Sequence, residues 1–291
     1  MSNVPRVDTS KHPNVSLFDI TEEFIETADK LIDSSANSVS DYWKQKYERD
    51  NSRNWDKFYK HNQSNFFKDR HYLVEEFSLN DFAGDQSGSF HVVDMGCGVG
   101  NALLPLLHYF PKMSAKGFDC SATAINLLQQ RLVDDELSHR CQVNEGDMTD
   151  STISYVDLYN TADFVLLLFV QSAIDPSHYD RIRELAWRIL KPGGILLFRD
   201  YGKYDMAQLR FEASSARQGN RISKDFYVRG DGTRAKFFTV DELRMIYETN
   251  HLFRTTEIVV HNKQFVNRKT DVVMKRIWIQ GKWTKVSKID S

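Results

Sequence analysis

Residues 91–101 read HVVDMGCGVGN, and this stretch decides the fold of the chain. An apolar run ends in the carboxylate of Asp94 and leads into three alternate glycines, and leucines at helical spacing follow from Leu103. Glycine lets the backbone turn sharply and approach a ligand, because it lacks a Cβ atom. The first amides of the following helix point towards whatever the turn holds. The stretch therefore predicts a strand, a glycine turn and a helix that bind a nucleotide-like cofactor.

The spacing of the glycines indicates which cofactor. A dinucleotide-binding G-x-G-x-x-G pattern would need a third glycine at position 101, where this chain has Asn101 instead. The D-x-G-x-G-x-G pattern instead resembles motif I of the class I S-adenosylmethionine-dependent methyltransferases. Asp119 ends the next apolar run, where an acid can hold ribose hydroxyls. Asp147 follows another run, where this class places an acid for the adenine amine. The glycines alone also fit a turn without a ligand, but the two acids favour a cofactor site.

Composition narrows the class of protein. The chain has 291 residues, 41% hydrophobic and 27% charged, which suits one large α/β domain with additions. No apolar run approaches the ~18 residues of a membrane span, and the polar N-terminus lacks a signal-peptide core. Cys97, Cys120 and Cys141 show no C-x-x-C spacing, so we expect free thiols, no zinc or other metal site, and a cytoplasmic or also nuclear location.

Charge is unevenly distributed along the chain. The formal net charge is −2, which does not by itself indicate nucleic-acid binding. From His261 to Ser291, however, basic residues greatly outnumber Asp271 and Asp290. Such a segment fits either a phosphate-binding face or a solvated edge strand protected by lysines.

Hydrophobic periodicity divides the chain into three parts. We expect a mobile tail and a short helix over residues 1–40, a helical extension over 41–90, and a catalytic domain over 91–291 with an insertion at 200–238. Alternating strands and helices predict a doubly wound, mostly parallel, seven-stranded Rossmann-like sheet with a reversed C-terminal hairpin. Strands are expected near 91–95, 115–119, 141–145, 162–169, 194–199, 254–261 and 272–283, and helices near 100–109, 121–133 and 176–191.

Four further strings identify a family. They are NWDKFYK at 54–60, NFFKDRH at 65–71, FRDYG at 198–202 and FYVRGDGTR at 226–234. With these, the chain resembles the eukaryotic tRNA 3-methylcytidine methyltransferases over about residues 54–285. The resemblance implies S-adenosylmethionine as cofactor, tRNA as partner, and cytidine 32 of the anticodon loop of threonine or serine tRNAs as target. It leaves open a need for seryl-tRNA synthetase or for a prior modification at position 37.

The methyl acceptor can also be argued from chemistry. Residues 168–173 lack the Asn/Asp-Pro-Pro-aromatic motif common in enzymes that methylate exocyclic amines. Cytosine N3 carries an in-plane lone pair and can attack the methyl sulfonium directly, so no general base is needed. Catalysis then depends on alignment and on compensating the positive charge that moves onto the base. We assign that compensation to Asp200, flanked by Arg199 and Tyr201; the alternative is that Asp200 pairs with Arg199 or a helix end.

The candidate binding residues form two sets, and for each aromatic residue taken singly core packing is the alternative. The target cytosine must leave its stack, so rings and arginines of the insertion are expected to hold it. This substrate set is Phe226, Tyr227, Arg229, Arg234 and Phe237. For the cofactor site, the resemblance implies that residues 41–90 fold over the cofactor as a lid and also bind RNA. The cofactor set is Trp55, Tyr59, Arg70, His71, Asp94, Gly96, Gly98, Gly100, Asp119, Cys120, Ser121, Asp147, Met148 and Leu168.

Two other functions remain open from the sequence. A class I methyltransferase for a small molecule or a protein would carry the same glycine loop and acids. A non-catalytic RNA-binding scaffold could keep the fold, although the intact acids at Asp94, Asp119 and Asp147 argue against loss of the cofactor site.

Overall fold

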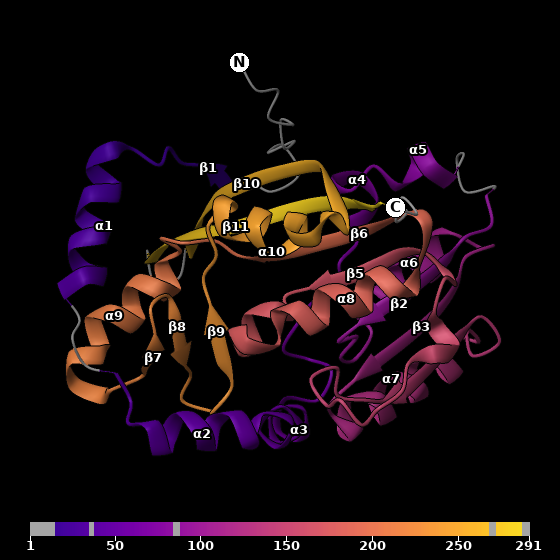
Figure 1. The fold of residues 1–291 in the computed structure, drawn as a ribbon, viewed down its shortest axis with the longest axis horizontal. Coiled ribbons are helices and arrows are strands. Elements are labelled where there is room, and N and C mark those ends of the chain that lie inside the picture. The colour runs from indigo at the N-terminus through magenta and orange to yellow at the C-terminus, as the bar shows by residue number, and fades with distance from the viewer. Residues whose placement is uncertain (1–14, 35–37, 84–87, 268–271, 287–291) are drawn as a thin grey trace.

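A central mixed β-sheet, covered by helices on both faces, organises the molecule (Figure 1). The computed structural model describes residues 15–34, 38–83, 88–267 and 272–286. The sheet has eight strands in the order β1-β10-β11-β6-β5-β2-β3-β4, of which β6, β5, β2, β3 and β4 run parallel. The strands are β1 (Val15–Leu17), β2 (His91–Met95), β3 (Ser114–Asp119), β4 (Cys141–Glu145), β5 (Ala162–Leu168), β6 (Leu190–Tyr201), β10 (Phe253–Asn267) and β11 (Val272–Lys285).

The doubly wound, mostly parallel sheet with a reversed hairpin is confirmed. β11 pairs antiparallel with β6 and β10 antiparallel with β11, as a C-terminal hairpin requires. The structure adds one strand to the seven expected, because Val15–Leu17 pairs with the outer side of β10. That segment had been assigned to a mobile tail; residues 1–14 of the tail lie outside the described residues.

The helices follow the sequence pattern closely, and none of those within the described ranges is long and apolar enough to cross a membrane. The expected helical extension over 41–90 begins with two helices that meet at Asp50, whose backbone leaves the helical conformation. The helices are α1 (Glu22–Ser34), α2 (Asp41–Arg49), α3 (Asn51–Asn62), α4 (Leu73–Glu76), α5 (Leu79–Ala83), α6 (Leu103–Tyr109), α7 (Ala122–Asp134), α8 (Tyr179–Ile189), α9 (Met206–Gln218) and α10 (Val240–Glu248).

Local capping explains where several helices begin. Thr239 accepts a hydrogen bond from the amide of Glu242 at 3.1 Å, which opens α10 as the capping box predicts. Thr21 accepts from the amide of Phe24 at 3.2 Å at the start of α1. Asp175 accepts from the amide of Ser177 at 3.0 Å and opens a single 3₁₀ turn before α8. These caps satisfy amides that have no partner inside the helix.

The insertion between β6 and α10 forms a small layer of its own. It holds α9 and an antiparallel sheet of β7 (Arg221–Ser223), β8 (Phe226–Val228) and β9 (Arg234–Lys236). Figure 1 shows this layer beside the carboxyl ends of the parallel strands, with α2 and α3 running beneath it and towards α7. The insertion and the N-terminal helices therefore flank the edge of the sheet where Rossmann-like folds bind their ligands.

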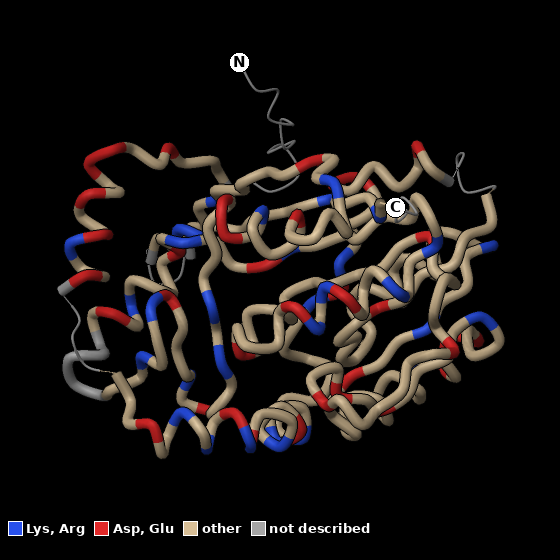
Figure 2. Tube along the Cα trace, in the orientation of Figure 1, with Lys and Arg blue, Asp and Glu red and all other residues tan. Residues whose placement is uncertain are grey.

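The basic C-terminal hairpin is largely occupied by internal contacts. Lys263 pairs with Glu76, Arg276 with Asp205, and Lys282 with Glu257. Lys285 donates to Asn160 and to the carbonyl of Leu190, while Lys275 lies over the rings of Phe18 and Phe24. Glu257 is the one acid in the described part of the hairpin, and Figure 2 shows that most acidic residues near it belong to the surrounding segments, as Glu76 and Asp205 do. Arg268, Lys269 and Lys288 lie outside the described residues.

Candidate active site

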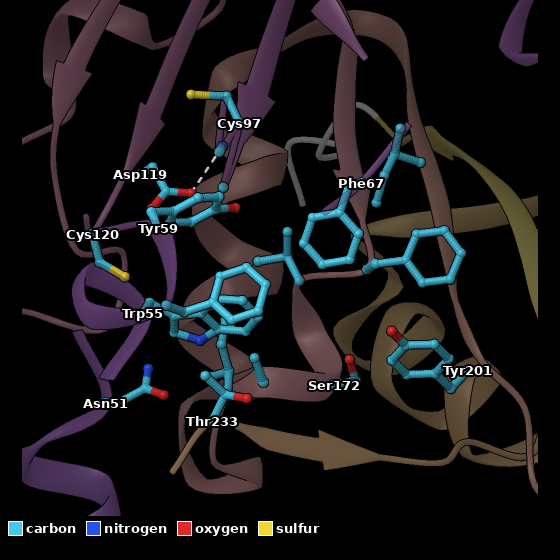
Figure 3. Close-up of a pocket in the computed structure, with 18 of the residues that line it drawn as sticks. Asn51, Trp55, Tyr59, Phe67, Cys97, Asp119, Cys120, Ser172, Tyr201 and Thr233 are labelled. Carbon is cyan, nitrogen blue, oxygen red and sulfur yellow. Dashed lines mark hydrogen bonds between the residues drawn. The ribbon is translucent and has the colours of Figure 1, made fainter. Parts of the chain in front are cut away.

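A cavity of about 490 Å³ opens where the carboxyl ends of β2, β3, β4 and β5 meet α3 and the insertion (Figure 3). This volume lies in the range of small-molecule and cofactor sites. One end of the cavity is lined by the glycine turn and by two acids, Asp119 and Asp147. The other end is lined by aromatic rings and arginines from the insertion and β11.

The glycine turn is tied to the acid that ends β3. The amide of Gly98 donates to Oδ2 of Asp119 at 2.9 Å, and the amide of Ser121 donates to Oδ1 at 2.9 Å. Gly98 has φ of 51°, and a Cβ there would lie 2.5 Å from Oη of Tyr59. Both its conformation and this close approach require glycine. The two amide bonds fix the Asp119 carboxylate in one orientation at the cavity wall.

The three glycines of the turn differ in role. Gly96 and Gly98 line the cavity, whereas Gly100 is not part of its lining. A Cβ at Gly100 would lie 2.3 Å from Cδ1 of Leu128, so this glycine allows the turn to pack against α7. Gly100, expected to contact the cofactor, thus serves helix packing.

Burial raises the pKa of both acids that flank the turn. The pKa of Asp94 is raised to about 7, with the guanidinium of Arg70 opposing the effect of burial. The pKa of Asp119 is raised to about 6, because burial outweighs the hydrogen bonds from Ser121 and Gly98. Asp94 is 3% exposed and lies behind the cavity lining, whereas Asp119 is part of that lining.

Asp147 is held at the cavity by residues from two segments. Its Oδ2 accepts from the hydroxyl of Ser52 on α3 at 2.7 Å, and its Oδ1 accepts from the amide and hydroxyl of Thr149. Met148, Trp55 and Leu168 add apolar surface to the cavity wall. The Ser52 bond brings the start of α3 against the loop that follows β4.

The N-terminal segment is fastened over the glycine turn. The side-chain amide of Asn101 donates to the carbonyl of Phe67 at 3.1 Å and to Asp69 at 3.0 Å. The backbone carbonyl of Asn101 accepts from the backbone amide of Arg70 at 2.7 Å. Arg131 of α7 reaches both oxygens of Asp69, at 3.1 and 3.0 Å. This fastening places Phe67 and Arg70 in the cavity lining, while His71 is exposed and outside it.

Helix α3 is also fastened to the start of α7. Oδ1 of Asp56 accepts from the hydroxyl of Ser121 at 3.0 Å and from the amide of Thr123 at 2.9 Å. The Ser121 hydroxyl in turn accepts from the amide of Ala124 and caps α7. Ser121, expected to flank the ribose, is fully buried and outside the lining, where it joins two helices. Its neighbour Cys120 does line the cavity.

The far end of the cavity is built from tilted aromatic rings and guanidinium groups. The ring of Tyr201 lies 5.2 Å from that of Phe169 and 5.8 Å from that of Phe237. The guanidinium groups of Arg229 and Arg276 each lie 5.7 Å from the centre of the Tyr201 ring. These five residues all line the cavity. A flat, unstacked base fits such a set of π faces and cations.

The structure places Asp200 behind the cavity wall. Its side chain is 0% exposed and its oxygens accept from the amides of Ser172 and Tyr201, at 2.8 and 2.9 Å. Burial raises the pKa of Asp200 to about 6. Ser172 and Tyr201 both line the cavity, so Asp200 shapes the wall through them and does not reach into it.

Four other predicted site residues also lie outside the lining. Arg199 pairs with Glu76 behind the sheet edge. Phe226 and Tyr227 are fully buried in the core of the insertion, where Tyr227 stacks on Phe211 at 5.3 Å. Arg234 is 1% exposed; it pairs with Glu48 of α2 and donates to the carbonyl of Ala173. Core packing, the alternative weighed for the aromatic residues, describes Phe226 and Tyr227, and internal ion pairs describe Arg199 and Arg234.

Several lining residues were not singled out from the sequence. Asn51, Phe67, Phe211, Asp231, Thr233 and Arg276 line the cavity in addition to the predicted set. Phe67 and Asp231 belong to the family strings and could have been chosen from them. Asn51 and Arg276 lie in segments whose pattern shows only a helix and a strand, so their position depends on how those elements pack. No group of three or more potential metal ligands occurs among the described residues.

Comparisons with known proteins agree with this geometry. The methyltransferase domain family matches residues 92–194. A solved S-adenosylmethionine-dependent methyltransferase from Methanosarcina mazei superposes with a TM-score of 0.52 over 69% of this chain and 94% of that chain, at 19% identity, which shows the fold alone.

Curated relatives are much more similar in sequence. The tRNA N(3)-methylcytidine methyltransferase Mettl2 of Drosophila melanogaster is 39% identical over 257 residues, covering 87% of this chain and 77% of that protein. The tRNA N(3)-cytidine methyltransferase METTL6 of Homo sapiens is 39% identical over 253 residues, 86% of either chain. The chain belongs to the tRNA N3-cytidine methyltransferase family. Its resemblance to that family, drawn from the four strings, is confirmed.

Members of the tRNA N3-cytidine methyltransferase family belong to the class that uses S-adenosylmethionine, and the cavity fits this cofactor. Each oxygen of Asp119 accepts one amide and Cys120 adds a side-chain hydrogen bond, so the carboxylate still has a lone pair for a ribose hydroxyl. The carboxamide oxygen of Asn51 is buried at the cavity without a hydrogen-bond partner. These features match a ligand with hydroxyl and amine donors.

Proposed function

We propose that this protein transfers the methyl group of S-adenosylmethionine to N3 of a cytidine in tRNA, at position 32 of the anticodon loop. The observation that carries the proposal is the single cavity with two unlike ends. Acids and glycines line one end, and rings with arginines line the other. A donor and a flat base bound in such a cavity would be in contact, which is what a direct transfer requires.

The donor end is assigned by the chemistry of its residues. S-adenosylmethionine supplies a methyl group on a positively charged sulfur. Asp119 would accept from the ribose hydroxyls, and Asp147 would accept from the adenine amine, with Met148 against the ring. Arg70, whose guanidinium lies 4.6 Å from the Phe169 ring, would pair with the carboxylate of the methionine part. Asp94 would act from behind the wall on the ammonium group of the same part.

The acceptor end orients a base whose nitrogen is already nucleophilic. Cytosine N3 has a free lone pair, so no side chain has to remove a proton before transfer. Tyr201 and Phe237 would stack on the extruded base and exclude water, while Arg229 and Arg276 would hold phosphates or base edges. The rate then depends on how accurately these groups align N3 with the methyl carbon.

Asp200 takes a positioning role in this proposal. It holds the amides of Ser172 and Tyr201, and through them the wall on which the base would lie. Charge on the buried carboxylate also acts across the wall, since Arg229 is close enough to lower the pKa of Asp200. Compensation of the positive charge that develops on cytosine is thus possible without contact.

The experiment compares tRNA transcripts as acceptors of labelled methyl groups. Threonine and serine tRNA transcripts with cytidine 32 are matched with transcripts that carry uridine 32, and free cytidine is a third acceptor. We expect labelling of the cytidine 32 transcripts alone. Labelling of free cytidine, or of a protein in the mixture, would overturn the tRNA assignment, and labelling of uridine 32 transcripts would overturn the position.

The same assay tests whether the chain needs a helper. We include reactions with added seryl-tRNA synthetase and reactions on tRNA that carries its natural modification at position 37. Stimulation by either addition identifies the helper. If the protein alone labels unmodified transcripts as strongly as the reactions with either addition, the chain needs no helper.

A further inference from the structure

Asn51 presents an unpaired carboxamide at the donor end of the cavity. The residue is 9% exposed and lines the cavity, and its Oδ1 has no hydrogen-bond partner. Among the described residues, none bonds its amide nitrogen either. A buried amide that makes no hydrogen bond costs free energy, so a group of this kind indicates a missing partner. Figure 3 shows Asn51 beside the part of the cavity bounded by Cys120, Trp55 and Thr233.

Contacts of α3 to the donor end and to the insertion fix the position of Asn51. Ser52, the next residue of α3, donates to Asp147 at 2.7 Å. Asn54, one turn along, donates to the carbonyl of Gly232 at 3.0 Å, and Asp56 accepts from Ser121. Asn51 is therefore held against the ends of β3 and β4, while Arg229 and Arg276 line the other end with Tyr201.

The chemistry of a carboxamide selects one kind of ligand edge. It offers one acceptor and one donor side by side, and rotation about its Cβ–Cγ bond exchanges their positions. The amino edge of adenine, with a 6-amino donor next to a ring-nitrogen acceptor, is complementary to such a pair, and asparagine commonly binds adenine in this way. The ribose hydroxyls and the methionine part are already assigned to Asp119 and Arg70, which leaves the adenine edge for Asn51.

We propose that Asn51 binds the amino edge of the adenine ring of the cofactor and accepts a hydrogen bond from its 6-amino group. The inference rests on the proposed function only in that the cofactor is an adenosine derivative. It adds a specificity-determining residue from α3 to the acids supplied by the sheet. It also means that the N-terminal helix, besides closing the cavity, takes part in choosing the base.

The test is a binding cycle with two ligands and no turnover. S-adenosylhomocysteine and its analogue without the 6-amino group are titrated into the full-length protein and its variants by calorimetry. Removing the 6-amino group should weaken binding to the wild-type protein by about 10-fold. Asn51→Ala should bind S-adenosylhomocysteine about 5- to 10-fold more weakly, and should then lose clearly less affinity than the wild type when the 6-amino group is removed.

Two further variants keep the result interpretable. Asn62→Ala removes the same side chain from the other end of α3, where it donates to the carbonyl of Phe58, and should bind both ligands as the wild type does. Asn51→Asp keeps the acceptor oxygen and should stay sensitive to the 6-amino group even if its overall affinity falls. The inference is overturned if the loss of affinity caused by Asn51→Ala and the loss caused by removing the 6-amino group are additive. It is also overturned if Asn51→Ala leaves S-adenosylhomocysteine binding unchanged and weakens only tRNA binding. Failure of the wild-type protein to bind S-adenosylhomocysteine would instead refute the proposed function.

Discussion

The backbone amide of Gly98 donates to Oδ2 of Asp119 at 2.9 Å, which joins the glycine turn after β2 to the acid that ends β3. The bond orients the carboxylate before any ligand arrives, and burial keeps its pKa raised to about 6. Tyr59 lies on the other side of the same glycine, with its hydroxyl 2.5 Å from where a Cβ would stand. The donor end of the cavity is thus assembled from three segments distant in sequence.

Replacing Gly98 should therefore disturb Tyr59. Gly98→Ala introduces both a clash with the Tyr59 hydroxyl and a side chain at φ of 51°. We expect it to lower the free energy of unfolding by about 1–3 kcal/mol and to weaken S-adenosylhomocysteine binding. Combining it with Tyr59→Phe removes the oxygen and should recover part of the loss in thermal unfolding. No recovery would show that Tyr59 is not the limiting contact.

Asp119→Ala should weaken the cofactor directly. Loss of the acceptor for the ribose hydroxyls should cost about 1–3 kcal/mol of binding free energy, measured by calorimetry with S-adenosylhomocysteine. Asp157→Ala, at an exposed acid outside the cavity lining, serves as control and should bind as the wild type does. Equal affinities for the two variants would remove Asp119 from the binding set.

Affinity for the cofactor should rise with pH. The raised pKa of Asp119, about 6, means that the free protein binds a proton there below pH 6, and this proton blocks an acceptor. S-adenosylhomocysteine should thus bind more weakly as the pH falls through 6 and reach a plateau above it. Asp119→Asn should lack this transition in calorimetric titrations from pH 5 to 8. Asp94, with its pKa raised to about 7, can add a second transition in the same direction, which Asp94→Asn would remove.

Asp200 should act on turnover more than on donor binding. Asp200→Ala leaves the amides of Ser172 and Tyr201 without an acceptor in a buried place, so we expect methyl transfer to fall at least about 100-fold while affinity for S-adenosylhomocysteine changes within a few-fold. Asp200→Asn keeps an acceptor and should recover much of kcat if the role is positional. An asparagine variant as inactive as the alanine variant would instead show that the charge itself is required.

The sequence predicted the sheet and the donor end well because both follow local patterns. β2 begins and ends where the apolar run does, and Gly98, Asp119 and Asp147 lie in the cavity lining as the motif spacing implies. Strand β1 was not predicted, since three residues are too few to carry a periodic signal and their pairing depends on the open edge of β10. The break at Asp50 was missed because residues 41–62 keep helical composition on both sides.

The acceptor end could be predicted only in part. Tyr201, Arg229 and Phe237 line the cavity, whereas Phe226 and Tyr227 are buried within the insertion. Arg234, also buried, bonds to α2 and to the carbonyl of Ala173. The sequence does not distinguish these positions, because aromatic residues and arginines serve both packing and binding. Arg234 in particular pairs with Glu48, a partner 186 residues away in the sequence. Asn51 carried no signal at all before α3 was placed against Asp147.

The most direct test of the account is the identity of the methylated nucleoside. Purified protein is incubated with tRNA and S-adenosylmethionine that carries an isotopically labelled methyl group. The tRNA is then digested, and its nucleosides are separated and identified by mass spectrometry against standards. The account predicts that the label appears in 3-methylcytidine. Label in 5-methylcytidine, in N4-methylcytidine or in another nucleoside, from a protein that binds S-adenosylhomocysteine, would contradict it.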